Sequence, residues 1–419
     1  MIKTFEAHKN FQYAQLSNSP FQSFWMAGYE CSDKLNAFGN RVDFLNITKH
    51  IDLIYEDYAL LKEFNISTVR EGIRWSYVEK EPYKYDFTIV AEMMIAAKHY
   101  NIQQVWDLCH FGFPDDLTPL HPMFARRYTA LCKAFLEFYR SIHPTAPLII
   151  VPINEVSFIS WLGGEACGTV PYCTGLGWQV KYKLMQAYIE GVAALKALDD
   201  NVIVISSEPL VNMVPPVFAT EADIEAAVAQ HQSQFQAMDI LCGRICPELN
   251  GNPDYLDIIG LNYYYNNQWI SGTTDFLVWK DELKDDRWKP LSHLVQEAYD
   301  RYNKPIVITE TSHPKEDRPL WMNEITTQLI DIINNDVPLL GVCIYPIIDR
   351  PDWDNLVTWH QSGLWDIEYN DVSLKRVLHQ PYADAFFQSQ KMIENYFVIQ
   401  QAIKKGSMRE NDFAFTSFK

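Results

Sequence analysis

The sequence predicts an α/β fold of the (β/α)₈ (TIM) barrel type. Short apolar runs, each bounded by polar or turn residues, recur along the chain and are typical of buried parallel strands. Longer amphipathic segments lie between these runs, and polar residues repeatedly follow the runs. Strands that alternate with helices form parallel sheets with right-handed crossovers, and eight such units close into a barrel.

The predicted elements follow this alternation from end to end. A doubly wound open sheet is the alternative, but no G-x-G-x-x-G follows an early strand. The eight expected strands are Phe24–Tyr29, Thr68–Ile73, Gln104–Leu108, Leu148–Ile153, Val202–Ser206, Leu256–Leu261, Ile306–Thr309 and Val342–Ile347. The expected helices are Ile51–Phe64, Thr88–Tyr100, Ala125–Ile142, Tyr182–Leu198, Leu291–Tyr302 and Trp321–Asn335.

The length suits one large domain. The chain has 419 residues, 48% of them apolar, and barrels with long loops reach this size. We expect a single catalytic barrel over residues 1–419, in which residues 381–419 add a helix and a tail. The tail carries Phe413, Phe415 and Phe418. These rings either pin the tail to the barrel or contact a partner subunit of a homo-oligomer.

The net charge of −18 limits the partners. Nucleic-acid binding requires clustered Lys and Arg, so we expect no nucleic acid, and an anionic membrane surface is disfavoured as well. No apolar run reaches the roughly 18 residues of a membrane span. The N-terminal segment lacks the apolar stretch of a signal peptide, which predicts a cytoplasmic protein.

The eight cysteines are scattered without a C-x-x-C pair. Cys167 and Cys173 fall in the segment Leu162–Trp178, which we expect to be a long loop after the fourth strand. No His lies close to them in the sequence, so a zinc site is not expected. Free thiols are the simplest interpretation, and a disulfide between Cys167 and Cys173 is the alternative. We expect neither a metal nor another cofactor.

Two carboxylates indicate the chemistry. Glu155 ends the fourth apolar run, after Asn154, and Glu310 ends the seventh. Barrel enzymes keep their catalytic residues at the C-terminal ends of the strands. A facing acid and nucleophile are the equipment of a retaining glycosidase, with carboxyl groups about 5–5.5 Å apart, and Asn154 could hold the sugar 2-hydroxyl. An isolated Asn-Glu is more often a helix cap or an ion-pair residue after a strand.

Further residues at strand ends support these carboxylates. Arg70 ends the second strand and Tyr264 follows the sixth, and either can keep Glu310 ionised as a nucleophile. His110 follows the third strand, and Trp353 lies beyond the eighth, where a ring can stack on a sugar. Each of these residues alone is as readily explained by an ion pair or by core packing. Their common position at strand ends favours a site.

The residues resemble glycoside hydrolase family 1, the β-glucosidase family of retaining (β/α)₈ enzymes. The resemblance runs from about Phe24 to about Phe387, with seven segments in the family's order. Its Asn-Glu-Pro acid/base motif corresponds to residues 154–156, and its Thr-Glu-Asn-Gly nucleophile motif to residues 309–312. The remaining segments are 69–75 with Arg70, 110–111 with His110 and Phe111, 260–264 with Asn262 and Tyr264, 345–353 with Tyr345, Asp352 and Trp353, and 363–369.

The resemblance implies an exo-acting β-glycosidase that binds a carbohydrate, and the departures from the family concern the sugar. Val156 replaces the Pro of the acid/base motif, which removes no carboxylate. Four changes lie where the family grips the non-reducing sugar, so glucose is not implied. Glu30 and Asp352 would also repel an anionic sugar. The four changed residues are Glu30 for Gln, Phe111 for Trp, Tyr345 for Trp and Asp352 for Glu.

Two other functions share these residues. A transglycosidase, or another retaining enzyme of the same superfamily, would form the same intermediate and differ only in the acceptor. A sugar-binding barrel without catalysis would account for the altered sugar grip, because fold does not guarantee function. The presence of both Glu155 and Glu310 argues against this last alternative.

Overall fold

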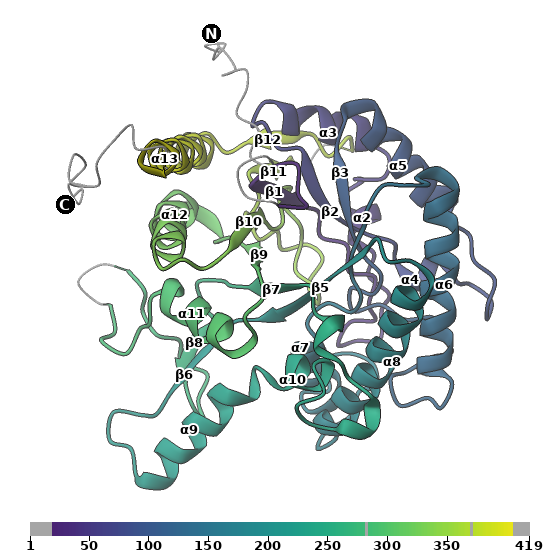
Figure 1. Ribbon diagram of the computed structural model, residues 1–419, viewed down its shortest axis with the longest axis horizontal. Helices are drawn as coiled ribbons and strands as arrows, with labels where there is room; N and C mark the ends of the chain where they lie inside the picture. Colours follow the sequence, from purple (N-terminus) through teal and green to yellow (C-terminus); the bar gives the residue numbers. More distant parts are fainter. Residues whose placement is uncertain (1–18, 281–283, 369–371, 405–419) are drawn as a thin grey trace.

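A closed barrel of eight parallel strands forms the centre of the computed structural model, which describes residues 19–280, 284–368 and 372–404 (Figure 1). The strands follow one another around the barrel in the order β1-β2-β3-β4-β5-β7-β9-β10. The predicted (β/α)₈ fold is therefore confirmed. The strands are β1 (Trp25–Gly28), β2 (Thr68–Gly72), β3 (Gln103–Asp107), β4 (Leu148–Val151), β5 (Val202–Pro209), β7 (Ile258–Asn262), β9 (Ile306–Thr311) and β10 (Leu339–Ile344).

Helices surround the barrel and bury their apolar faces against it. All six predicted helices are present, and two of them have the predicted bounds. Short helices and turns continue several of the loops at the C-terminal ends of the strands. The helices are α2 (Phe44–Ile47), α3 (Ile54–Lys62), α4 (Trp75–Val78), α5 (Thr88–Tyr100), α6 (Phe124–Ile142), α7 (Val156–Gly164), α8 (Gly177–Leu198), α9 (Glu221–Ser233), α10 (Gln236–Leu241), α11 (Leu291–Tyr302), α12 (Arg318–Asn334) and α13 (Gln380–Lys404).

The loops after β4, β5 and β7 contain elements that the apolar pattern did not predict. The helix α7 begins directly after Glu155 and is apolar on most of its surface, so it shows no helical period. The predicted loop Leu162–Trp178 is accordingly shorter, because α7 continues to Gly164 and α8 begins at Gly177. A small parallel sheet pairs β6 (Asn212–Val214), which follows β5, with β8 (Gln268–Ile270), which follows β7.

Successive side chains of each strand point to opposite sides of the barrel wall. On β2, Arg70 therefore enters the barrel, whereas Glu71 points toward α3. One apolar cluster drawn from the strands fills the interior, and a larger one lies between the strands and the helices. The interior cluster includes Met26, Val105, Ile149, Val151, Ile205, Ile258, Val307, Leu340 and Cys343.

The C-terminal helix α13 packs along α12 (Figure 1). The aromatic tail with Phe413, Phe415 and Phe418 lies outside the described residues. Cys167 and Cys173 are free thiols, so the alternative disulfide is not formed.

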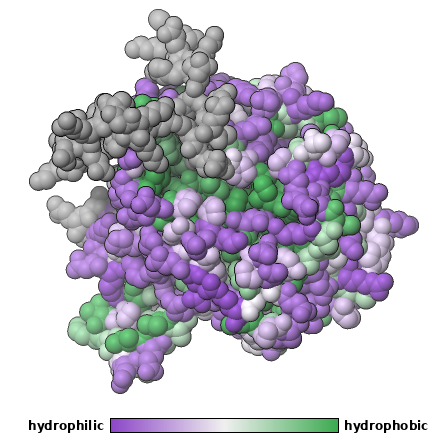
Figure 2. Space-filling view, in the orientation of Figure 1, coloured by the Kyte–Doolittle hydropathy of each residue, from purple (hydrophilic) through white to green (hydrophobic). Residues whose placement is uncertain are grey.

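The surface is mainly hydrophilic in the view of Figure 2. An apolar patch at the lower left lies over α9 and the loop before it, where Val217, Phe218, Ile224 and Val228 are exposed. Among the helices of the described ranges, none combines the length and apolar character needed to cross a membrane.

Candidate active site

A cavity of about 1140 Å³ opens at the C-terminal ends of the barrel strands. Its volume slightly exceeds the usual range of ligand pockets, roughly 300–1,000 Å³. Both predicted carboxylates line it. The predicted site residues on its wall are Glu30, His110, Phe111, Glu155, Tyr264, Glu310, Tyr345 and Trp353.

Glu310 lies one residue before the end of β9 and accepts two strong hydrogen bonds. Nη1 of Arg70 lies 2.6 Å from Oε1 of Glu310, and the hydroxyl of Tyr264 donates to Oε2 over 2.7 Å. A cation and a phenol donor both favour the ionised carboxylate. Burial, followed by the charge of Glu310, raises the pKa of Tyr264 well above its ordinary value, so Tyr264 keeps its proton. Glu310 thus has the surroundings that an ionised nucleophile requires.

Arg70 is itself fixed by Asp107, at the end of β3. Nε and Nη2 of Arg70 bind the two oxygens of Asp107 over 2.9 and 2.8 Å, and Nη2 also donates to Oδ1 of Asn154 over 2.8 Å. Burial lowers the pKa of Arg70, but Asp107 and Glu310 outweigh burial and raise it. Because Nε and Nη2 are engaged by Asp107 and Asn154, the planar guanidinium directs Nη1 toward Glu310.

Glu155 lies opposite, with its backbone in the left-handed region at φ 47° and ψ 58°. Its Oε1 accepts a hydrogen bond of 2.9 Å from Nδ2 of Asn262. Oδ1 of Asn262 accepts from the hydroxyls of Ser207 and Thr309, which fixes the amide so that its NH₂ group faces Glu155. Asn262 therefore orients the carboxyl of Glu155.

The two carboxyls have different surroundings. Burial, followed by the charge of Glu310, raises the pKa of Glu155 well above its ordinary value. Arg70 also acts on Glu155, but more weakly, whereas it contacts Glu310 directly. Glu155 therefore keeps its proton to higher pH than an ordinary carboxyl, as a general acid requires, while Arg70 and Tyr264 bind the carboxylate of Glu310.

The inner end of the cavity is built around His110. Its Nδ1 lies 2.6 Å from Oδ2 of Asp107, and its Nε2 lies 3.3 Å from Nδ2 of Asn154 and 3.4 Å from the hydroxyl of Tyr345. Burial lowers the pKa of His110, but Asp107 outweighs burial and raises it. The rings of His110 and Tyr345 stack at 8° with their centroids 5.8 Å apart. These contacts hold the polar side chains at the inner end of the cavity in place.

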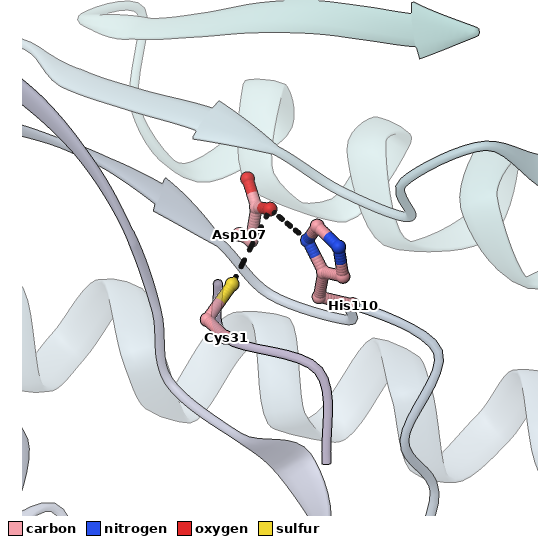
Figure 3. Close-up of side chains that lie close together, drawn as sticks. All are labelled: Cys31, Asp107 and His110. Carbon is pink, nitrogen blue, oxygen red and sulfur yellow. Dashed lines mark hydrogen bonds and ion pairs between the residues drawn. The ribbon is translucent and has the colours of Figure 1, made fainter. Parts of the chain in front are cut away.

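Figure 3 shows that the carboxylate of Asp107 lies between the thiol of Cys31 and the ring of His110. One ligand-type atom of each residue lies within 4.8 Å of the others, a spacing that a metal ion could use. Both oxygens of Asp107, however, already bind the guanidinium of Arg70. The cationic partner of this carboxylate is therefore a side chain of the protein, and the cluster fits a hydrogen-bonding role.

Glu30 and Arg350 form a charged pair on the cavity wall. Nε of Arg350 lies 3.3 Å from Oε2 of Glu30, and Ser32 donates its N–H and hydroxyl to Oε1. Burial raises the pKa of Glu30, but Arg350 and His110 outweigh burial and lower it. Arg350 thus offsets the repulsion that we expected Glu30 to exert on an anionic sugar. Sequence reasoning missed Arg350.

Asp352 does not line the cavity, although we expected it among the residues that bind the sugar. Its carboxylate accepts the N–H groups of Asp354 and Asn355, each over 2.8 Å, and lies 3.3 Å from Nε2 of His360. The turn after Trp353 uses this carboxylate to satisfy its own backbone, so His360 faces the cavity in its place. Trp353 lies on the wall as expected.

The outer part of the cavity is lined mainly by aromatic side chains that the sequence analysis did not single out. They come from α7, the first turn of α8, β8 and the segments on either side of β8, and all of them lie outside the helices and strands that the sequence predicts. These residues are Phe158, Trp161, Trp178, Tyr265, Trp269 and Phe276.

No family model matches the chain, and no curated protein matches it. Among solved structures, it is similar to the family 1 β-glucosidase from Thermotoga maritima, with a TM-score of 0.68, 14% identity, and coverage of 89% of this chain and 97% of that one. The castanospermine complex gives 0.69, 14%, 89% and 97%, and the isofagomine lactam complex 0.66, 16%, 82% and 86%. At these identities the likeness shows that this chain has the barrel fold of family 1 β-glucosidases.

Proposed function

We propose that the protein is a retaining, exo-acting β-glycosidase. Glu310 attacks the anomeric carbon as the glycosidic C–O bond breaks, and Glu155 donates its proton to the leaving oxygen. Glu155, now ionised, then takes a proton from water, whose oxygen displaces Glu310 and releases the sugar with its original configuration. Neither half-reaction needs a cofactor.

The contrast between the two carboxyls is the observation that carries this proposal. Arg70 and Tyr264 bind Glu310 directly, whereas burial and the charge of Glu310 raise the pKa of Glu155. Both side chains reach the same cavity. Double displacement requires a nucleophilic carboxylate and an acid/base carboxyl in one cavity.

The closed inner end of the cavity supports exo action. Glu30, His110 and Tyr345 form this end and are 5%, 3% and 2% exposed. A wall of buried side chains leaves no room for a chain that continues past the terminal sugar. The aromatic outer part would then hold the leaving group.

A panel of nitrophenyl β-glycosides tests the proposal, with glucoside, galactoside, fucoside, mannoside and xyloside assayed on the wild type and on Glu310→Ala. The proposal expects turnover of at least one sugar, and loss of that turnover in the variant. Turnover that persists in Glu310→Ala would contradict the assigned nucleophile. Silence across the panel, together with sugar binding measured by calorimetry, would favour a binding protein.

Transglycosylation is a second candidate, since the aromatic outer part of the cavity could hold an acceptor in place of water. Added alcohols or sugars would then convert the product into a new glycoside. Cytoplasmic location and a homo-oligomeric state stay predictions from the sequence.

A further inference from the structure

Glu208 is a buried carboxylate beside Glu155 that the proposed mechanism does not use. It lies near the C-terminal end of β5 and is 1% exposed. Its Oε2 accepts the N–H of Ser157 over 3.0 Å, and the N–H of Val156 also favours the charge of its carboxylate. These are the first two residues of α7, directly after Glu155.

The contact with Val156 depends on a departure from the family motif. Pro stands at this position in the Asn-Glu-Pro motif, and Pro has no N–H to donate. Val156 has an N–H, and this N–H favours the charge of Glu208. The free N–H groups at a helix start favour a negative charge, so this contact also stabilises the first turn of α7.

The neighbouring residue of β5 fixes Glu155 from a second side. The carbonyl of Ser207 accepts the N–H of Glu155 over 2.8 Å, and the hydroxyl of Ser207 donates to Asn262. A left-handed backbone at a non-glycine residue persists only where surrounding contacts determine it. Ser207 binds the backbone N–H of Glu155, and Glu208 binds the backbone that follows Glu155. Together they determine the direction of the Glu155 side chain.

The charge of Glu208 has no close cation. Among the residues that the structure describes, no ion pair holds its carboxylate: Nζ of Lys181 donates to Gln236, and the charge of Lys181 opposes the raised pKa of Glu208 without direct contact. Burial raises the pKa of Glu208, although the amide donors oppose it. After burial and Glu310, Glu208 is a further contributor to the raised pKa of Glu155.

We propose that Glu208 is a positioning residue for Glu155: its carboxylate holds the first turn of α7 directly after Glu155 and thereby fixes the direction of the Glu155 side chain. The catalytic consequence of this inference rests on the proposed glycosidase function, whereas the position of Glu155 itself does not.

Two variants distinguish the effect of the charge of Glu208 from the effect of its side-chain length. Glu208→Gln keeps an acceptor oxygen for the amides of α7 and removes the charge. Glu208→Asp keeps the charge and draws the carboxylate back by one methylene. Glu79→Gln is the matched control, because Glu79 is fully buried and accepts the N–H of Tyr83 but does not line the cavity.

The first measurement is a carbon NMR titration of protein labelled with ¹³C at the glutamate side-chain carboxyls. The signal of Glu155 is assigned as the one that is missing from the spectrum of Glu155→Gln. Because the position of the Glu155 carboxyl sets its distances from Glu310 and Asn262, its titration midpoint should shift in Glu208→Asp and stay in place in Glu79→Gln. An unchanged midpoint in Glu208→Asp would overturn the positioning role. This measurement needs no enzymatic activity.

The second measurement compares leaving groups. Glu208→Asp should lower kcat/KM by roughly 10- to 100-fold for glycosides whose leaving oxygen needs a proton, the size of loss that a misplaced group of about 1 Å causes. Nitrophenyl glycosides with acidic leaving groups should lose much less. Equal losses for both would overturn the positioning role. Absence of activity in the wild type would reject the glycosidase function while the titration still decides on Glu208.

Discussion

Two buried ionic networks lie on opposite sides of β2, and only one of them reaches the cavity. Arg70 and Glu71 are neighbours on this strand and point to opposite faces. The inner network links Arg70 to the barrel interior, and the outer network links Glu71 to the helices. The inner network is Arg70, Asp107, His110 and Glu310. The outer network is His50, Asp57, Tyr58, Glu71 and Arg376.

The outer network ties distant parts of the chain together. Glu71 accepts the Tyr58 hydroxyl over 2.7 Å and lies 3.0 Å from Nε2 of His50, and Nδ1 of His50 lies 2.8 Å from Asp57. Arg376 binds both oxygens of Asp57 over 2.8 Å, which joins the segment before α13 to α3. Burial lowers the pKa of His50, but Glu71 and Asp57 outweigh burial and raise it to about 9.

Burial and a shifted pKa therefore do not by themselves mark a site, since structural networks also shift pKa values. None of the outer residues lines the cavity, whereas His110 and Glu310 do. Access to the cavity and a second carboxyl in contrasting surroundings distinguish the inner network. Substitutions in the inner network should accordingly lower activity, and substitutions in the outer network should lower stability.

The largest expected effect is on activity, from the inner network. Glu310→Ala should lower kcat by about 10⁵- to 10⁶-fold, as expected when a covalent nucleophile is removed. Glu71→Gln should leave kcat/KM of the folded enzyme unchanged. Steady-state kinetics, with circular dichroism to establish folding, checks both. A comparable loss of kcat in folded Glu71→Gln would break the distinction between the networks.

Removal of the acid should cost less and change the pH profile. Because the pKa of Glu155 is raised, its acid form persists to higher pH than that of an ordinary carboxyl, and kcat/KM should fall as pH rises through that pKa. Glu155→Gln should lose about 10²- to 10⁴-fold on poor leaving groups. With activated leaving groups, its profile should lack the basic limb. A basic limb that persists in this variant would assign the acid to another residue.

In the outer network, Arg376→Met should destabilise the fold. It leaves the carboxylate of Asp57 buried beside His50 without its guanidinium, a loss of about 3–5 kcal/mol by comparison with other broken buried pairs. Urea denaturation measures this change in the free energy of unfolding. The kcat/KM at 25 °C should stay at the wild-type value, and a specific loss of activity without destabilisation would contradict the structural role.

The smallest effect is a pH dependence of stability. The folded pKa of His50 is about 9, above the ordinary value of about 6.5, so its charge stabilises the fold fully below pH about 6.5. This contribution should be lost as pH rises through about 9, by up to about 3 kcal/mol, since one pKa unit corresponds to about 1.4 kcal/mol. Urea denaturation between these pH values should show the decline. His50→Gln should flatten it, whereas the exposed control His121→Gln should not.

The sequence predicted the barrel because each buried parallel strand is a local apolar run. Glu155 and Glu310 were found for the same reason, as polar residues that end such runs. Asp107 was missed because it lies inside a predicted strand, and Glu208 because the predicted fifth strand ended at Ser206. Each could have been found as an acidic residue near a strand end.

Other features depend on contacts that no local pattern contains. The placement of Asp352 follows from backbone N–H groups in its own turn. The pair of Glu30 and Arg350 joins residues 320 positions apart, and α7 has no helical period because it is apolar on most sides. Such features arise from tertiary packing.

The most direct test of the central claim is to trap the glycosyl-enzyme. The wild type is incubated with an activated 2-deoxy-2-fluoro β-glycoside of the sugar that it turns over, and the protein is analysed by intact mass and peptide mapping. Our account predicts one covalent sugar on Glu310. Steady turnover of the parent glycoside without any adduct, or with an adduct on another residue, would contradict it.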